Sequence, residues 1–145
     1  MIRVLLTIAF LALAACGQQS TKPDIVVSDV WARGVAPGQT TGTAYMTIAN
    51  KGGGADRLLS AKASLSQASA LHASRTVNGV TSMAPVDSLE IPAKGRVELA
   101  PGGTHLMIMD LGVPMTAGDR FFVDLKFEKS GHKTVAGKIV MAGSR

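Results

Sequence analysis

The chain has 145 residues, one Cys and a formal net charge of +5. This length fits one domain, and a single Cys excludes an intramolecular disulfide, a Cys-based zinc finger and a Cys-ligated iron–sulfur cluster. Aromatic residues make up only 4% of the chain, which argues against stacking platforms for single-stranded nucleic acid.

Residues 1–15 are expected to be a leader rather than part of the fold. Arg3 gives a positive start, and residues 4–15 are apolar apart from Thr7, which is too short to span a bilayer. Leu13-Ala14-Ala15-Cys16 resembles the lipobox of bacterial lipoproteins, in which the Cys is lipidated and becomes the new N-terminus. Ordinary cleavage after Ala12-Leu13-Ala14 is the alternative, and both interpretations export the protein.

The lipobox interpretation divides the chain into a leader (1–15), a lipidated Cys16 with a polar tether (16–24) and a folded domain (25–145). Gly17 stands where such lipoproteins carry an Asp when they stay in the inner membrane, so the resemblance favours the outer membrane. A lipidated Cys16 also leaves the folded part without a thiol, which excludes thiolate nucleophiles and blue-copper sites.

The rest of the chain reads as about eight short strands separated by Gly, Pro and Asn turns. This pattern predicts an all-β fold, an antiparallel Greek-key sandwich or barrel. Residues 64–71, rich in Ala and Ser, leave room for a helical turn. The expected strands cover residues 26–33, 43–48, 57–63, 70–77, 80–86, 95–99, 105–111, 121–128 and 133–141.

Asn78-Gly79 is a strong signal for a two-residue hairpin. A two-residue loop places Ser74 opposite Met83 and His72 opposite Pro85. Residues directly opposite, or two apart on one strand, share a face. His72, Ser74 and Met83 are therefore expected to point the same way, with His72 and Met83 as diagonal neighbours.

Strand alternation divides residues 105–109 between two faces. Leu106 and Ile108 are core candidates, whereas His105, Met107 and Met109 lie on the other face. From this strand alone, the two Met residues either fill a gap in the core or belong to a binding site. For His132, Met46 and Met141 a structural role is expected.

The spacing His72-x10-Met83-x21-His105-x-Met107 resembles the ligand motif of the periplasmic copper chaperones called PCu(A)C. Chance gives such a four-residue pattern on the order of once in ten thousand sequences of this composition. Val30-Trp31-Ala32-Arg33, Ala44-Tyr45-Met46 and Pro101-Gly102-Gly103 also resemble segments of that family. The resemblance runs from about residue 29 to residue 140.

The resemblance implies a cupredoxin-like β-barrel that binds one Cu(I) per chain and is not an enzyme. His72, Met83, His105 and Met107 would be the copper ligands, and soft Cu(I) favours thioether sulfur and imidazole nitrogen. Family members pass copper toward the Cu-A centre of cytochrome c oxidase. The implied partner is therefore a copper acceptor, either oxidase subunit II or a Sco-type thioredoxin-like chaperone, and the implied protein is a monomer anchored by lipid in the periplasm.

Two features depart from the family pattern. Family members often carry a Met two residues after the first His, where this chain has Ser74. Some also have a His/Met-rich tail for a second copper, whereas this sequence ends with Met141-Ala142-Gly143-Ser144-Arg145.

Two other classes of function compete with a copper carrier. A copper-dependent redox enzyme could share the same ligands, although Asp87 and Glu90 are expected to be solvated charges rather than an acid–base pair. A β-sandwich binding module without a metal would leave the His/Met spacing unexplained. Nucleic-acid binding is not expected, since the Lys and Arg residues are scattered and the chain is exported.

Overall fold

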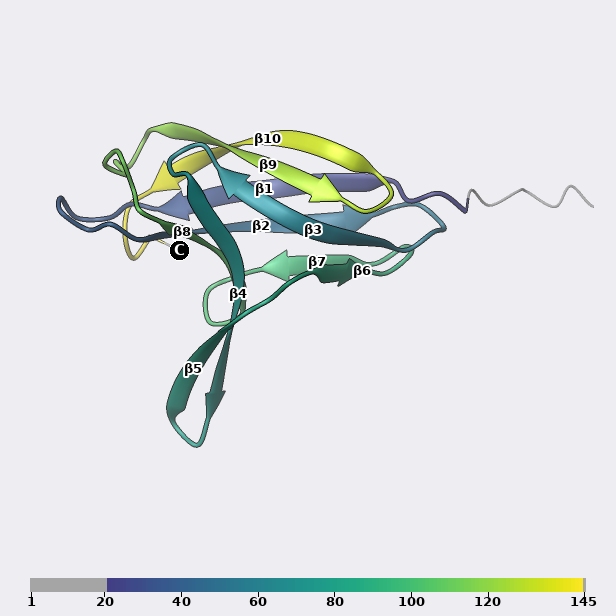
Figure 1. Ribbon diagram of the computed structural model, residues 1–145, viewed down its shortest axis with the longest axis horizontal. Helices are drawn as coiled ribbons and strands as arrows, with labels where there is room; N and C mark the ends of the chain where they lie inside the picture. Colours follow the sequence, from purple (N-terminus) through teal and green to yellow (C-terminus); the bar gives the residue numbers. More distant parts are fainter. Residues whose placement is uncertain (1–20, 145) are drawn as a thin grey trace, which may run out of the picture.

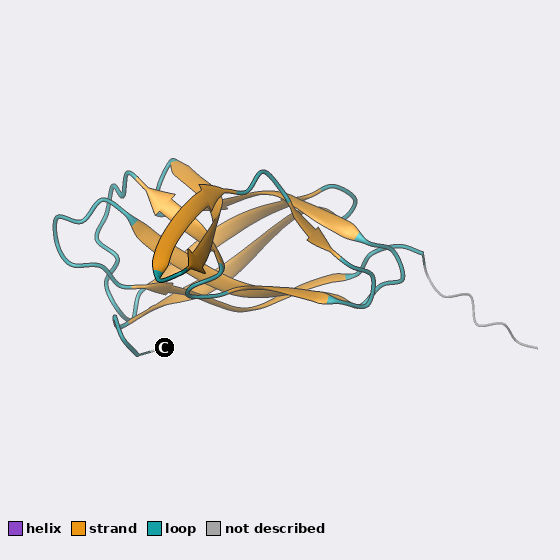
Figure 2. Ribbon diagram, turned by 90° about the horizontal axis from the view of Figure 1, so that it is seen from below, coloured by secondary structure: helices purple, strands orange, loops and turns teal. Residues whose placement is uncertain are grey.

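The computed structural model describes residues 21–144, so the expected leader and Cys16 lie outside the described residues. The described part forms ten β-strands and no helix (Figures 1 and 2). It therefore contains no helix long and apolar enough to cross a membrane. The strands are β1 (Ile25–Arg33), β2 (Gly42–Asn50), β3 (Asp56–Ala63), β4 (Ala68–Val77), β5 (Val80–Pro85), β6 (Leu89–Ile91), β7 (Arg96–Leu99), β8 (Thr104–Met109), β9 (Arg120–Phe127) and β10 (Gly131–Val140).

The all-β prediction is confirmed, with two differences in detail. The helical turn allowed for residues 64–71 is absent, because β4 begins at Ala68 after a short turn. β6 was not predicted, since three residues are too few to show an alternating pattern. Its pairing with β3 buries Ile91 in the core.

One sheet runs in the order β5-β4-β8-β2-β1-β10-β9-β3-β6, with β7 paired to β2. Adjacent strands in this sheet pair antiparallel, as predicted, except that β1 and β10 pair parallel. The hydrophobic core contains residues from strands that lie far apart in this order, for example Ile48 in β2 and Leu125 in β9. The sheet therefore curls over and encloses its apolar face, which makes it a sandwich-like barrel (Figure 2).

Strict alternation in β9 shows how the sequence builds this core. Phe121, Val123, Leu125 and Phe127 are buried, whereas the residues between them are exposed. Because side chains alternate between the faces of a strand, this pattern fixes which side of β9 faces inward.

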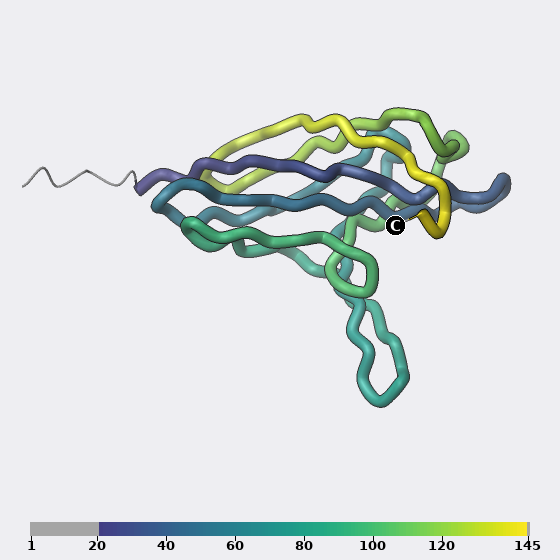
Figure 3. The backbone as a smooth tube through the Cα atoms, turned by 180° about the vertical axis from the view of Figure 1, so that it is seen from behind, coloured from purple at the N-terminus to yellow at the C-terminus, as the bar shows by residue number. Residues whose placement is uncertain are grey.

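The β4–β5 hairpin projects away from the barrel (Figures 1 and 3). β4 pairs with β8 only as far as Ala73, and beyond that point β4 and β5 pair with each other alone. Every residue of β5 is exposed. The hairpin is thus an arm held at its base by β8.

The last residues of the expected tether are part of the fold. The amide of Gly54 donates to the carbonyl of Lys22 at 3.4 Å, and the amide of Lys51 donates to the carbonyl of Asp24 at 2.8 Å. A Cβ on the buried Gly52 would meet the backbone of Lys22 and Asp24. The glycine turn between β2 and β3 therefore holds residues 21–24 against the domain.

Asp56 fastens the turn between β9 and β10. Its carboxylate accepts hydrogen bonds from the backbone amides of Arg57 at 2.8 Å, Lys129 at 2.9 Å and Ser130 at 3.0 Å. Burial alone would raise the pKa of Asp56, but hydrogen bonds from Ser130 and from the amides of Lys129 and Arg57 hold this pKa below its ordinary value near 3.8. The charged carboxylate is therefore favoured by the folded state.

The free energy of unfolding should depend on this group at acid pH. Because the pKa is lower in the folded state, the stabilisation is present above pH 3.8 and is lost as the pH falls through the folded-state value. Asp56→Asn should lower stability by about 1–2 kcal/mol at pH 7 and by less at pH 3. Urea unfolding at both pH values measures this, with the exposed Asp87→Asn as the control. An equal loss at both pH values would contradict the assignment.

Candidate metal centre

The register of β5, β4 and β8 gathers the four predicted ligands on one face of the sheet. His72 lies opposite Pro85 on β5 and opposite His105 on β8, and Ser74 lies opposite Met83. The predicted hairpin register is therefore confirmed. Met107 is two residues beyond His105 on β8, so it shares the same face.

The opposite face of β4 and β8 belongs to the core. Leu71, Leu106 and Ile108 are at most 4% exposed and pack in the main apolar cluster. This resolves the choice left open for β8, because the Leu and Ile positions fill the core and leave the His/Met face outside it.

Exposure rises from β8 toward the hairpin. His105 is only 4% exposed, His72 and Met107 are half-buried, and Met83 is 53% exposed. The site thus has a protected side, built on the barrel, and an open side on the projecting arm.

Backbone carbonyls orient both imidazoles in the same way. Nδ1 of His105 lies 3.0 Å from the carbonyl oxygen of Gly103, and Nδ1 of His72 lies 3.4 Å from that of Ala70. A carbonyl can only accept, so Nδ1 carries the proton in each neutral ring. Nε2 then keeps its lone pair, which is the atom a metal ion needs.

The Nε2 atom of His105 is buried and has no hydrogen-bond partner. Such an atom is costly to bury, and a native structure usually gives it a partner or a ligand. Among residues 21–144 no three His, Cys, Asp or Glu side chains come together as a metal site. The thioethers of Met83 and Met107 lie on the same face as the two histidines.

The two imidazole rings are close to the spacing that one ion requires. Their centroids are 6.3 Å apart and their planes differ by 22°. Two imidazoles sharing one ion through bonds of about 2.0 Å have centroids roughly 5–6 Å apart. The observed centroid spacing is thus slightly longer than that of two imidazoles on one ion.

A second, smaller cluster borders the site on β2 and β1. Thr43 lies opposite Met107, and Tyr45 follows two residues later on the same face. Trp31 and Tyr45 are buried with ring centroids 4.4 Å apart, and the Tyr45 hydroxyl donates to Thr43 at 3.0 Å. These packed side chains make the barrel side of the site rigid.

The other residues considered from the sequence lie apart from the four candidate ligands. Met46 and Met115 are 1% exposed and belong to the core, as a structural role requires. His132 is exposed on β10, opposite Lys126, and Met141 is 69% exposed after β10. Met109 shares the face of Met107 but lies two pairs further along, opposite Ala68.

The carbonyls of Gly103 and Ala70 were not predicted as part of the site. No side-chain pattern reports a backbone oxygen that faces an imidazole. The turn before β8 is the nearest signal, since Pro101-Gly102-Gly103 brings the chain back immediately before His105.

Comparison with known proteins decides the family. A family model described as "Putative lipoprotein LpqE-like" matches residues 25–139. The chain belongs to the LpqE-like family. A putative lipoprotein of Leifsonia xyli subsp. xyli, Lxx21020, is 34% identical over 113 residues, which cover 77% of this chain and 67% of that protein.

Solved structures similar to this LpqE-like chain include PCuAC domains, which confirms the resemblance expected from the sequence. The copper-bound PCuAC domain of PmoF2 is 25% identical with a TM-score of 0.67, covering 81% of this chain and 92% of that domain. Apo-DR1885 from Deinococcus radiodurans is 26% identical with a TM-score of 0.65, covering 99% of this chain and 96% of that protein. The Cu(I) form of DR1885 has a TM-score of 0.58 at 26% identity, covering 89% and 85%.

The ring tautomers can be tested without a metal. In the apo protein at alkaline pH, His105 and His72 should both carry their proton on Nδ1, because each Nδ1 donates to a carbonyl. Long-range nitrogen–proton correlation spectra of the rings report the tautomer directly, with the exposed His132 as a comparison. A proton on Nε2 of His105 would contradict the geometry.

Proposed function

We propose that this LpqE-like protein is a copper carrier of the cell envelope that binds one Cu(I) through His72, Met83, His105 and Met107. The observation that carries the proposal is the strand register, which gathers two Nε2 lone pairs and two thioethers on one face outside the core. The likeness to a copper-bound PCuAC domain supports the same cargo.

The ligand set suits the monovalent ion. Two neutral imidazoles and two thioethers add no charge, so they favour Cu(I) over Cu(II), and thioether sulfur is the soft ligand that Cu(I) prefers. Met also resists the disulfide chemistry that a thiol undergoes in an oxidising compartment. The site therefore suits a protein that works outside the cytoplasm.

The uneven exposure of the ligands suits release as well as binding. His105 is fixed on the barrel, whereas Met83 lies half-exposed on the projecting hairpin. An acceptor can therefore replace Met83 first and take the ion by stepwise ligand exchange. A thioether binds less tenaciously than a thiolate, which favours transfer over storage.

We propose a lipid anchor at Cys16, which the name of the Leifsonia xyli relative supports. The protein would act as a periplasmic monomer, with the outer membrane favoured by Gly17. The acceptor would be a copper protein, such as the Cu-A centre of cytochrome c oxidase or a Sco-type chaperone. A carrier is preferred to an enzyme because the carboxylates near the hairpin form no acid–base pair: Asp87 is exposed and Glu90 lies opposite Arg57.

Competition with a chromogenic Cu(I) chelator tests the proposed ligands. The wild-type protein should take up one Cu(I) per chain. Met83→Leu and His105→Ala should each weaken binding by more than the roughly 10–100-fold that loss of an outer-shell partner costs. No uptake of Cu(I) would refute the function, and unchanged affinity in both variants would refute the site.

Two other methionines provide matched controls for that titration. Met109→Leu changes a thioether on the same face, two pairs beyond Met107, and Met115→Leu changes one in the core. Both should leave the Cu(I) affinity within about twofold, although Met115→Leu should lower the free energy of unfolding by up to about 1.5 kcal/mol. A large loss of Cu(I) affinity in Met109→Leu would show that the copper site lies further along β8 than proposed.

Ser74 offers a gain-of-function test. It lies opposite Met83 on the same face as His72, so Ser74→Met adds a thioether beside the proposed ligands. This variant should bind Cu(I) several-fold more tightly in the same competition titration. Thr76→Met, one step further toward the hairpin tip on the same face, is the control and should have no effect. Equal effects of the two substitutions would show that added sulfur acts non-specifically.

A further inference from the structure

Three turns and the start of the described chain meet at one end of the barrel, around the glycine turn of residues 51–55 (Figure 1). Residues 21–24 are hydrogen-bonded to this turn as described above. The turn of residues 92–95 joins it through the amide of Lys94, which donates to the carbonyl of Gly52 at 3.0 Å. The turn of residues 128–130 joins it through Nζ of Lys129, which donates to the carbonyl of Ala55 at 2.7 Å.

Each of these four segments carries one exposed lysine. They are Lys22, Lys51, Lys94 and Lys129, and we call this group the tether-end lysines. Lys51 and Lys94 also line an open hollow together with Arg96. The group therefore concentrates positive charge on a single small surface.

Two of the acidic groups at this end have other partners. Asp56 is 2% exposed and bound to backbone amides. Glu128 lies 3.9 Å from Arg57. Asp24 and Glu90 are exposed, and they offset part of the lysine charge.

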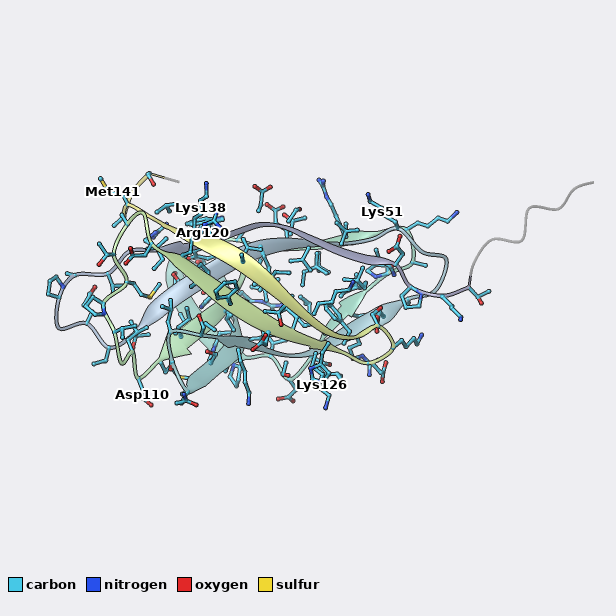
Figure 4. All side chains as sticks on the ribbon, turned by 90° about the horizontal axis from the view of Figure 1, so that it is seen from above. Lys51, Asp110, Arg120, Lys126, Lys138 and Met141 are labelled. Carbon is cyan, nitrogen blue, oxygen red and sulfur yellow. The ribbon has the colours of Figure 1, made fainter. Side chains whose placement is uncertain are left out.

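The loops at the other end of the barrel expose acidic rather than basic side chains. The loops of residues 34–41 and 110–119 contain no Lys or Arg, and they expose Asp110 and Asp119. Figure 4 shows Lys51 toward one end of the long axis and Asp110 toward the other. Arg120 and Lys138, which lie opposite each other near the ends of β9 and β10, also lie toward Asp110 in that view, so the difference in charge is confined to the loops.

The basic end is also the end nearest the proposed anchor. Five residue steps separate Cys16 from Thr21, and at about 3.5 Å per residue they reach at most roughly 18 Å. Because residues 21–24 are pinned to the glycine turn, the tether cannot lengthen by peeling away without breaking those hydrogen bonds. The tether-end lysines must stay close to any bilayer that holds Cys16.

We infer that the tether-end lysines form a docking surface for anionic phospholipid headgroups of the membrane that holds the protein. Lysines near an anionic bilayer are attracted to it over about a Debye length. Docking at this end directs the acidic loops away from the bilayer. The β4–β5 hairpin projects from the side of the barrel (Figure 1), so the exposed side of the proposed copper site stays accessible to an acceptor. This inference rests on the lipid anchor in the proposed function.

Energy transfer to a labelled bilayer measures the orientation. The processed lipoprotein is reconstituted into vesicles of phosphatidylcholine, with or without about one third phosphatidylglycerol, that carry a headgroup-linked acceptor dye. A donor dye is placed at Ala93→Cys in the turn beside Lys94, or at Ala117→Cys in the acidic loop. Transfer from position 93 should exceed transfer from position 117 on anionic vesicles, and the difference should shrink on neutral vesicles or in about 1 M salt.

Matched charge variants identify the surface. The triple variant Lys51→Gln, Lys94→Gln, Lys129→Gln should abolish the effect of anionic lipid, since each lysine favours docking roughly fivefold and the three together about a hundredfold. The control triple variant Lys62→Gln, Arg120→Gln, Lys138→Gln removes the same charge from strands β3, β9 and β10 and should dock normally. Equal transfer from both dye positions, or a larger effect of the control variant, would overturn the inference.

The test of lipid docking can be distinguished from the test of the proposed copper site. Cu(I) titration of the same preparations reports the His/Met site independently, because none of the tether-end lysines lies on β4, β5 or β8. Normal Cu(I) binding without lipid-dependent orientation would reject the docking surface alone. Failure to recover a lipidated chain would reject both the anchor and the docking surface.

Discussion

The hydrogen-bond register between β4 and β8 is the constraint on which the site depends. It sets His72 directly opposite His105, and the hairpin register then adds Met83 to the same face. A shift of one residue would turn every side chain to the other face. If β8 shifts, the buried Leu106 would leave the core and His105 would enter it. The apolar core therefore fixes the geometry of the candidate metal centre, although none of the four candidate ligands belongs to the apolar cluster.

The division of the site between barrel and arm links the fold to the proposed transfer. On the barrel, the carbonyl of Gly103 orients His105, and the Trp31–Tyr45 pair packs on the same face. On the arm, β5 is exposed throughout and pairs only with β4. In the proposed function, the barrel side would keep part of the ligand set in place before an ion arrives, which lowers the cost of binding. The exposed side would give an acceptor a first point of exchange.

Much of this arrangement could be predicted from the sequence. Asn78-Gly79 sets the hairpin register, and alternation in residues 105–109 separates core from site. Three features could not be predicted, and each has a physical reason. The parallel pairing of β1 with β10 depends on how distant strands meet, β6 is too short to show a period, and the carbonyls that orient the histidines leave no trace in side-chain identity. The folded state of residues 21–24 was also missed, because it depends on the glycines of a turn that lies about 30 residues further along the chain.

The central claim is that two imidazoles and two thioethers of this chain hold one Cu(I). X-ray absorption at the copper edge of the Cu(I)-loaded protein tests it most directly, because sulfur and nitrogen neighbours scatter differently. The account predicts a mixed shell of two nitrogen and two sulfur neighbours, with one sulfur lost in Met83→Leu. A shell of nitrogen and oxygen alone, or one unchanged by that substitution, would contradict it.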